Sequence, residues 1–177
     1  MNTHKDITLI GLFTAILIAG QFALFGISGV EIVTVLFASF AFYFGVIRGL
    51  IVATAFSVLR CLVFGFFPNV LILYLVYYNL FAVVIGLLGK KMNKSLSALK
   101  LIIVVLVLTI LTIIFTLLDN VITPLYYGMT GETLKSYWLL SLTAVVPQTI
   151  CAIITTTTLL PPLIKVYSKI GFTSYIK

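Results

Sequence analysis

Charged side chains are scarce in this chain. Only 8% of its 177 residues are Asp, Glu, Lys or Arg, whereas 62% are hydrophobic. A water-soluble domain needs far more polar side chains to cover its surface, so a soluble globular protein is excluded. The net charge is +7. Because the basic residues lie in short segments between apolar runs, this charge is typical of membrane topology and lipid contact, and not of nucleic-acid binding.

Histidine is almost absent, and recognisable catalytic motifs are missing. The single histidine, His4, lies in the N-terminal tail, which excludes axial-histidine haem ligation and an intramembrane zinc site. No HExxH, GxSxG or P-loop motif occurs. Ser57 lies in an apolar run with no histidine to activate it. The sequence therefore predicts no enzyme, catalytic residue, metal or cofactor, and energy for any transport must come from a partner or a gradient.

The chain has two cysteines, Cys61 and Cys151, and both lie within apolar runs. We expect free thiols that behave as small hydrophobic side chains, and no disulfide. The N-terminal apolar run continues for about 20 residues and has no small-residue cleavage site after a short core, so we expect a retained first helix and not a signal peptide.

The apolar runs are long enough to cross a bilayer, which takes about 20 residues per helix. We predict an all-α integral membrane protein that forms one domain over 1–177, a bundle of six transmembrane helices. The predicted helices are 7–27, 30–47, 49–67, 70–89, 101–119 and 137–161. Residues 120–136 form the longest predicted loop, and Pro161-Pro162 is expected to end the last helix.

The basic residues give this bundle an orientation. With the N-terminus inside, the cytoplasmic face receives Lys5, Arg48, Lys90, Lys91, Lys94, Lys100, Lys165, Lys169 and Lys177. Only Lys135 is then external, and Arg60 falls within a span. The positive-inside rule therefore predicts a multi-pass plasma-membrane protein with both termini in the cytoplasm.

Polar residues gather in the outer halves of the predicted spans, namely Gln21, Glu31, Arg60, Asn79, Asp119 and Gln148. A charged group in a span costs at least about 2.5 kcal/mol, so each is expected to face the bundle interior and to find a partner. Arg60 either anchors an acceptor group of a ligand or forms an ion pair with Glu31 or Asp119. Both roles are compatible. Asn79 and Gln148 either bind a ligand or join helices through hydrogen bonds.

Aromatic residues are concentrated at the same outer end. Most Tyr and Trp residues there are expected in the interfacial belt of the membrane. A minority can wall a pocket and stack on a flat ring, and we assign that role to Tyr74, Tyr78 and Trp138.

Small residues recur every fourth position in the first predicted helix, at Gly11, Ala15, Ala19 and Ala23. Such a ridge lets another helix backbone approach closely. It serves either packing within the bundle or docking onto a different membrane subunit.

Several of these features together resemble the substrate-binding S component of energy-coupling factor (ECF) vitamin transporters. Six helices in 177 residues, both ends inside, and the AxxxA ridge from Ala15 to Ala19 are similar to that family. So are the glycine-bounded entry to the second helix at 29–34, the turn at 44–49, and the end of the fourth helix from Gly86 to Lys91. No signature of a particular vitamin subfamily is present.

The resemblance implies a substrate-capture subunit of an ATP-driven importer. Such a subunit binds a small water-soluble vitamin or related micronutrient near the external face, and pairs with a membrane T component and two cytoplasmic ATPase subunits. On this basis Ala15 and Ala19 contact the T component, and loops near Glu31, Pro68 and Tyr126 gate the pocket. The alternative is a non-transporting scaffold of a larger membrane complex, in which the small-residue ridge is the whole function.

Overall fold

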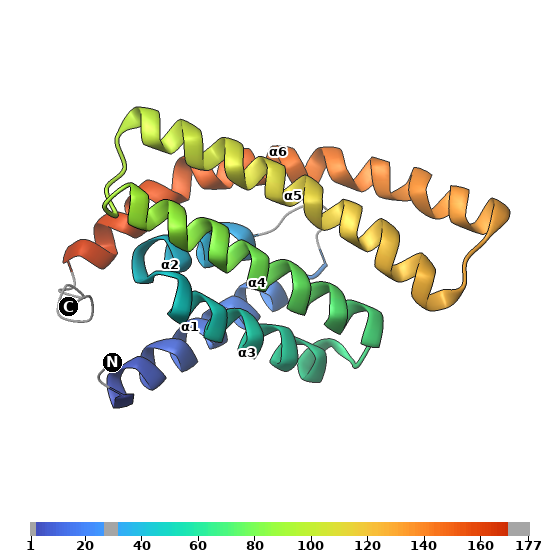
Figure 1. Cartoon of the computed structure of the whole chain (residues 1–177), viewed down its shortest axis with the longest axis horizontal. Coiled ribbons are helices and arrows are strands. Elements are labelled where there is room, and N and C mark those ends of the chain that lie inside the picture. The colour runs from blue at the N-terminus through green and yellow to red at the C-terminus, as the bar shows by residue number, and fades with distance from the viewer. Residues whose placement is uncertain (1–2, 27–31, 170–177) are drawn as a thin grey trace.

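The computed structural model describes residues 3–26 and 32–169, and every regular element in these two ranges is an α-helix. The helices are α1 (Thr3–Ala23), α2 (Val33–Phe44), α3 (Val46–Phe64), α4 (Pro68–Lys91), α5 (Ala98–Tyr127) and α6 (Gly131–Lys169). α1 begins and α6 ends at the same end of the molecule (Figure 1). The all-helical fold class predicted from composition is confirmed.

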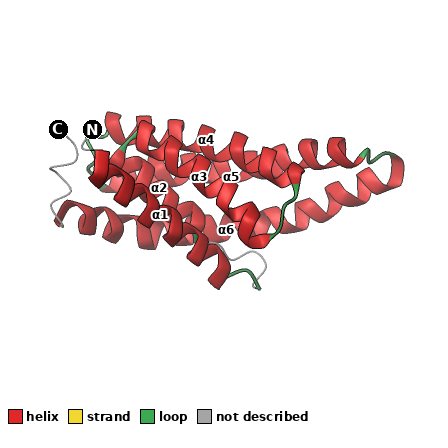
Figure 2. Ribbon diagram, turned by 90° about the horizontal axis from the view of Figure 1, so that it is seen from below, coloured by secondary structure: helices red, strands yellow, loops and turns green. Residues whose placement is uncertain are grey.

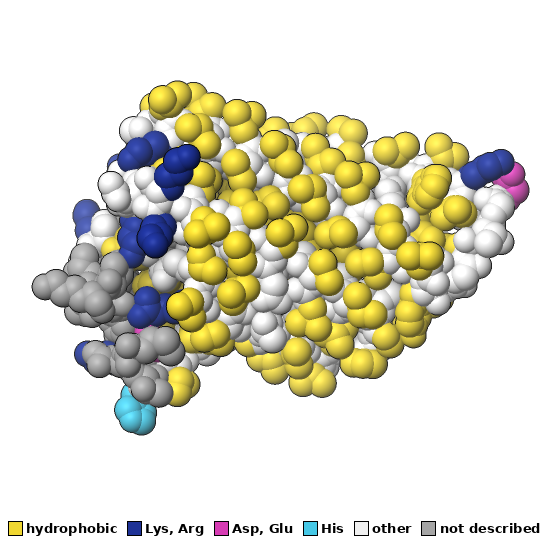
Figure 3. All heavy atoms as spheres, viewed as in Figure 1, with side chains coloured by type: hydrophobic (Ala, Val, Ile, Leu, Met, Phe, Trp, Pro, Cys, Tyr) yellow, Lys and Arg dark blue, Asp and Glu magenta, His cyan; other side chains and the backbone are white. Residues whose placement is uncertain are grey.

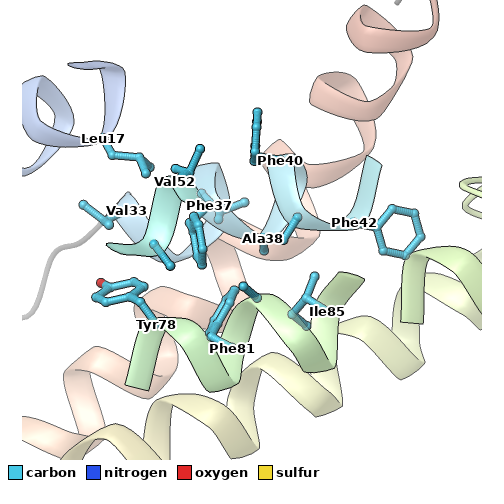
Figure 4. Packing of buried hydrophobic residues seen from close by; sticks show 14 of the residues in the cluster. Leu17, Val33, Phe37, Ala38, Phe40, Phe42, Val52, Tyr78, Phe81 and Ile85 are labelled. Carbon is cyan, nitrogen blue, oxygen red and sulfur yellow. The ribbon is translucent and has the colours of Figure 1, made fainter. Parts of the chain in front are cut away.

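The short helix α2 lies at the centre of the bundle, and all its residues except Leu36 are buried. Phe37 packs against Tyr78 and Phe81 of α4, with ring centroids 5.4 and 5.3 Å apart (Figure 4). A helix that is apolar on every side is stable only when other elements surround it. Accordingly, α2 contacts α1, α3, α4 and α6, while α3, α4, α5 and α6 pack as successive neighbours (Figure 1).

Glycines allow α4 to approach the end of α2 and the start of α3 closely. A Cβ atom on Gly89 would overlap the carbonyl group of Phe42, and one on Gly86 would lie 2.8 Å from the backbone nitrogen of Val46. Gly45 links α2 to α3 with a φ of 89°, in the left-handed region that glycine adopts without strain. Glycine at these positions therefore permits the tight packing of α2 inside the bundle.

The predicted loop at 120–136 is wrong. α5 continues to Tyr127 and α6 begins at Gly131, so only residues 128–130 connect them. The polar residues of this stretch are held within the helices, since Thr123 and Tyr137 hydrogen-bond to Asp119. Gly128, at a φ of 62°, ends α5. The resulting α5–α6 hairpin projects beyond the other helices in both ribbon views (Figures 1 and 2).

The predicted end of the last helix at Pro161-Pro162 is also wrong, because α6 continues to Lys169. Its final turns are anchored by tertiary contacts. Ile164 and Tyr167 are buried, and the Tyr167 hydroxyl lies 2.9 Å from the Ser39 hydroxyl of α2. These contacts hold the chain in helical geometry beyond the two prolines, which alone disfavour a helix.

Within the part of the chain that the structure describes, five helices are long and apolar enough to cross a membrane: α1, α3, α4, α5 and α6. α2 has only 12 residues, about 18 Å of helix, so the span predicted at 30–47 is shorter than expected. Hydrophobic side chains cover the middle of the molecule, and Lys and Arg gather where α1 begins and α6 ends (Figure 3). We call this the basic end. The chain is a helical protein with several potential membrane spans.

A buried ion pair joins two helices at the basic end. The Arg48 Nε atom of α3 lies 2.8 Å from the Asp6 Oδ1 atom of α1, and the Asp6 side chain is only 1% exposed. Lys94 lies nearby, 5.7 Å from the centre of the Tyr43 ring. Partial burial and the positive charge of Arg48 lower the pKa of Lys94. The pair fixes the start of α1 against α3, a contact that sequence reasoning did not predict.

Candidate functional site

A groove of about 650 Å³ lies between α5 and α6, away from the basic end. Its polar lining includes Thr116, Asp119, Glu132, Ser136, Tyr137 and Gln148. Phe115, Met129 and Leu140 contribute apolar surface. The volume falls in the range of small-molecule pockets, about 300–1,000 Å³, and the mixture of apolar walls with a few polar groups is typical of them.

A second, smaller cavity of about 70 Å³ adjoins this groove inside the bundle. Its walls come from Thr34, Tyr74, Tyr77, Tyr78, Thr112, Phe115 and Gln148. Phe115 and Gln148 line both spaces, so they form the junction between the groove and the inner cavity. The inner cavity has room for about two water molecules or one small polar group of a ligand.

Gln148 is the polar residue at this junction. It lies on α6 and is partly buried, and its side-chain amide forms no hydrogen bond with the described residues. An amide side chain offers two donor hydrogens and one acceptor oxygen. The Gln148 side chain is therefore available to a bound molecule.

A polar network includes two residues of the groove lining, Asp119 and Tyr137. Asn69 of α4 donates to the Thr123 hydroxyl at 3.1 Å, and Thr123 donates to Asp119 Oδ1 at 2.7 Å. The Tyr137 hydroxyl of α6 donates to Asp119 Oδ2 at 2.6 Å. This network joins α4, α5 and α6 through one carboxylate. Hydrogen bonds of this kind to a carboxylate are stronger than those between neutral groups.

Arg60 lies on α3, outside the groove and the inner cavity. Its guanidinium carbon sits 4.4 Å from the centre of the Tyr74 ring, and the Tyr74 hydroxyl accepts a hydrogen bond from Gln21 at 3.2 Å. Arg60 Nε and Gln21 Oε1 are buried without hydrogen-bond partners among the described residues. Arg60 forms no ion pair with Asp119, which was one of its two expected acidic partners. The other, Glu31, lies outside the described residues.

The remaining predicted site residues divide into two groups. Tyr74, Tyr78, Gln148 and Asp119 do converge on the groove and the inner cavity. Asn79 lines neither space, because its amide donates to the Leu75 carbonyl and accepts from Thr54 of α3. Trp138 also lines neither space; its indole N–H donates to the Asn120 carbonyl, and the residue is about half exposed.

Sequence reasoning missed several lining residues, chiefly Thr112, Phe115, Thr116 and Tyr137. A usable signal was present. Thr112, Thr116 and Asp119 recur at intervals of four and three on an otherwise leucine-rich helix, which places them on one face. That polar stripe marks the side of α5 that faces the groove.

The small-residue ridge of α1 faces away from the bundle. Gly11, Ala15, Ala19 and Ala23 are all exposed, and a Cβ atom on Gly11 would meet nothing within 4 Å. The ridge therefore does not serve packing among the described helices.

Known proteins do not identify the chain. No family model matches it, and no curated protein or solved structure is significantly similar to it. Within 3–26 and 32–169 no group of three His, Cys, Asp or Glu side chains is placed to hold a metal ion. The groove and the inner cavity offer a bound molecule aromatic side chains, hydroxyl groups, the Gln148 amide and the carboxylates of Asp119 and Glu132.

Proposed function

We propose that this chain is the substrate-capture subunit of an ATP-driven importer of the ECF type, which binds a small water-soluble vitamin or related micronutrient. In this proposal six helical segments form the membrane domain, the basic end faces the cytoplasm, and the groove opens near the external face of the plasma membrane. A membrane T component and two ATPase subunits supply the energy.

The observation that carries the proposal is the groove joined to a polar inner cavity, with the Gln148 amide at their junction. A bundle that served only as a scaffold has no need of a pocket-sized space whose lining includes an amide without a hydrogen-bond partner among the described residues. The outward ridge of α1 supports the second part of the proposal, because small residues on an exposed helix face suit close docking of a partner helix.

A binding experiment tests the capture function. Native mass spectrometry of the protein purified alone in mild detergent is expected to show a stoichiometric small molecule, which its mass identifies. Gln148→Leu should weaken binding of that molecule at least about tenfold, the equivalent of about 1.4 kcal/mol. Asn79→Leu is the matched control. It removes a carboxamide from a transmembrane helix outside both spaces, so binding should persist. Equal loss in both variants would contradict a site at Gln148.

A non-transporting scaffold is the second candidate, and the ridge on α1 favours it equally. Ala15→Trp combined with Ala19→Trp separates the two functions. Capture predicts that the double variant still binds its solute but no longer co-purifies with the T component and the ATPases. An empty wild-type protein whose melting temperature no vitamin raises, together with loss of a partner in the double variant, would support the scaffold instead.

A further inference from the structure

The charged side chains that line the groove are both acidic. They are Asp119 and Glu132, and no Lys or Arg of the described chain lines the groove or the inner cavity. This is unexpected in a protein whose 11 basic residues outnumber its 4 acidic ones. Arg60, the basic residue closest to this region in the sequence-based prediction, lies outside both spaces.

The two carboxylates differ in how they are compensated. Glu132 lies at the mouth of the groove and pairs with Lys135 at 2.9 Å, and both side chains are mostly exposed. Asp119 is partly buried and forms no ion pair with any described residue. It accepts one hydroxyl hydrogen bond on each oxygen, from Thr123 and Tyr137, so each oxygen keeps a further acceptor position. Its negative charge is thus oriented but not neutralised.

Aromatic rings continue from Asp119 into the inner cavity. Phe115 lies one helical turn before Asp119 on α5 and contacts Tyr77, with ring centroids 4.8 Å apart. Ring faces attract cations, and the protein already has such contacts, for example between Arg60 and Tyr74. A carboxylate that shares a groove with aromatic side chains favours a positively charged ligand and disfavours an anion.

We propose that the groove selects a small organic cation, whose charged nitrogen lies near Asp119 and whose apolar or ring portion contacts Phe115. This inference rests on the proposed capture function and names the substrate class that the sequence left open. In this proposal the guanidinium group of Arg60 stabilises the protein through its contact with the Tyr74 ring, and it does not bind an anionic group of the ligand.

Three probes that share a benzyl group test the sign of the charge: benzyltrimethylammonium, benzyl alcohol and phenylacetate. Dissociation constants are measured from the rise in melting temperature of the full chain in an uncharged detergent. Benzyltrimethylammonium should bind at least about tenfold more tightly than phenylacetate. Asp119→Asn should abolish this preference, while Asp119→Glu, which keeps the charge, should retain it.

The outcomes of this experiment distinguish failure of the cation class from failure of the capture function. Equal or tighter binding of phenylacetate or benzyl alcohol would overturn the cation class while leaving solute capture standing. No binding of any probe to a protein that native mass spectrometry finds empty would overturn the capture function, and the cation class with it. If Asp119→Asn does not fold, Tyr137→Phe serves in its place. That variant removes a donor to Asp119 but keeps the charge, so it should keep or increase the cation preference, and a lost preference would overturn the inference.

Discussion

The close approach of α4 to α2 makes a quantitative prediction for Gly89→Ala. The added Cβ atom would overlap the Phe42 carbonyl group, which is backbone and cannot rotate away. Overpacking of this kind costs about 3 kcal/mol, at the upper end of the usual range. Replacing glycine by alanine within a helix stabilises the helix by about 1 kcal/mol. The free energy of unfolding therefore falls by about 2 kcal/mol, which lowers the melting temperature by about 4–8 °C in a chain of this size.

Gly11→Ala is the matched control for this prediction. Gly11 is also helical, but an added Cβ atom there meets nothing within 4 Å. Only the gain in helix propensity remains, so its melting temperature should rise by about 2–4 °C. Both variants are compared with wild type by thermal unfolding in the same detergent. A rise for Gly89→Ala similar to that for Gly11→Ala would refute the contact between α4 and the Phe42 carbonyl.

Two further predictions concern the basic end. Asp6→Asn breaks the buried ion pair with Arg48 and should destabilise the protein by about 3 kcal/mol, because it leaves the charge of Arg48 uncompensated. Lys135→Gln breaks an exposed ion pair and should leave the melting temperature unchanged. Equal effects of the two variants would contradict the burial of Asp6. The orientation of the basic end is tested by cysteine labelling of intact cells, in a variant without Cys61 and Cys151. An impermeant maleimide should label Thr130→Cys but not Lys91→Cys. The reverse pattern would show that the basic end faces outward.

Composition and apolar run length were sufficient to predict the helical fold class and the core of every helix. The predicted helix 101–119 lies entirely within α5, for example. Helix ends were predicted less well where tertiary contacts override local signals. Asn120 and Thr123 look like loop residues in a sequence, but Asp119, Tyr137 and Trp138 bind this stretch into a helical hairpin. Pro161-Pro162 likewise does not end α6, because Tyr167 is held by Ser39.

The position of a residue in the sequence gives its height along a helix, but it does not give the direction in which the side chain points. A rise of 1.5 Å per residue places Arg60, Asn79 and Gln148 at similar heights, and this arithmetic requires only helix positions. Which way each side chain points depends on the rotation of its helix, and a helix that is apolar all round carries no stripe that reveals it. Gln148 therefore reaches the groove while Asn79 turns to Thr54. The polar stripe on α5 was the exception that sequence reasoning overlooked.

The continuity of α6 has a mechanical consequence. One uninterrupted helix carries Tyr137, bonded to Asp119 beside the groove, and Tyr167, bonded to Ser39 near the basic end, about 45 Å apart along its axis. No loop separates the two contacts, and Pro147, Pro161 and Pro162 are the points between them at which the helix can bend. In the proposed capture function, any partner at the basic end whose binding is coupled to the groove through α6 would change the affinity of the groove by the same factor as the ligand changes the affinity for that partner.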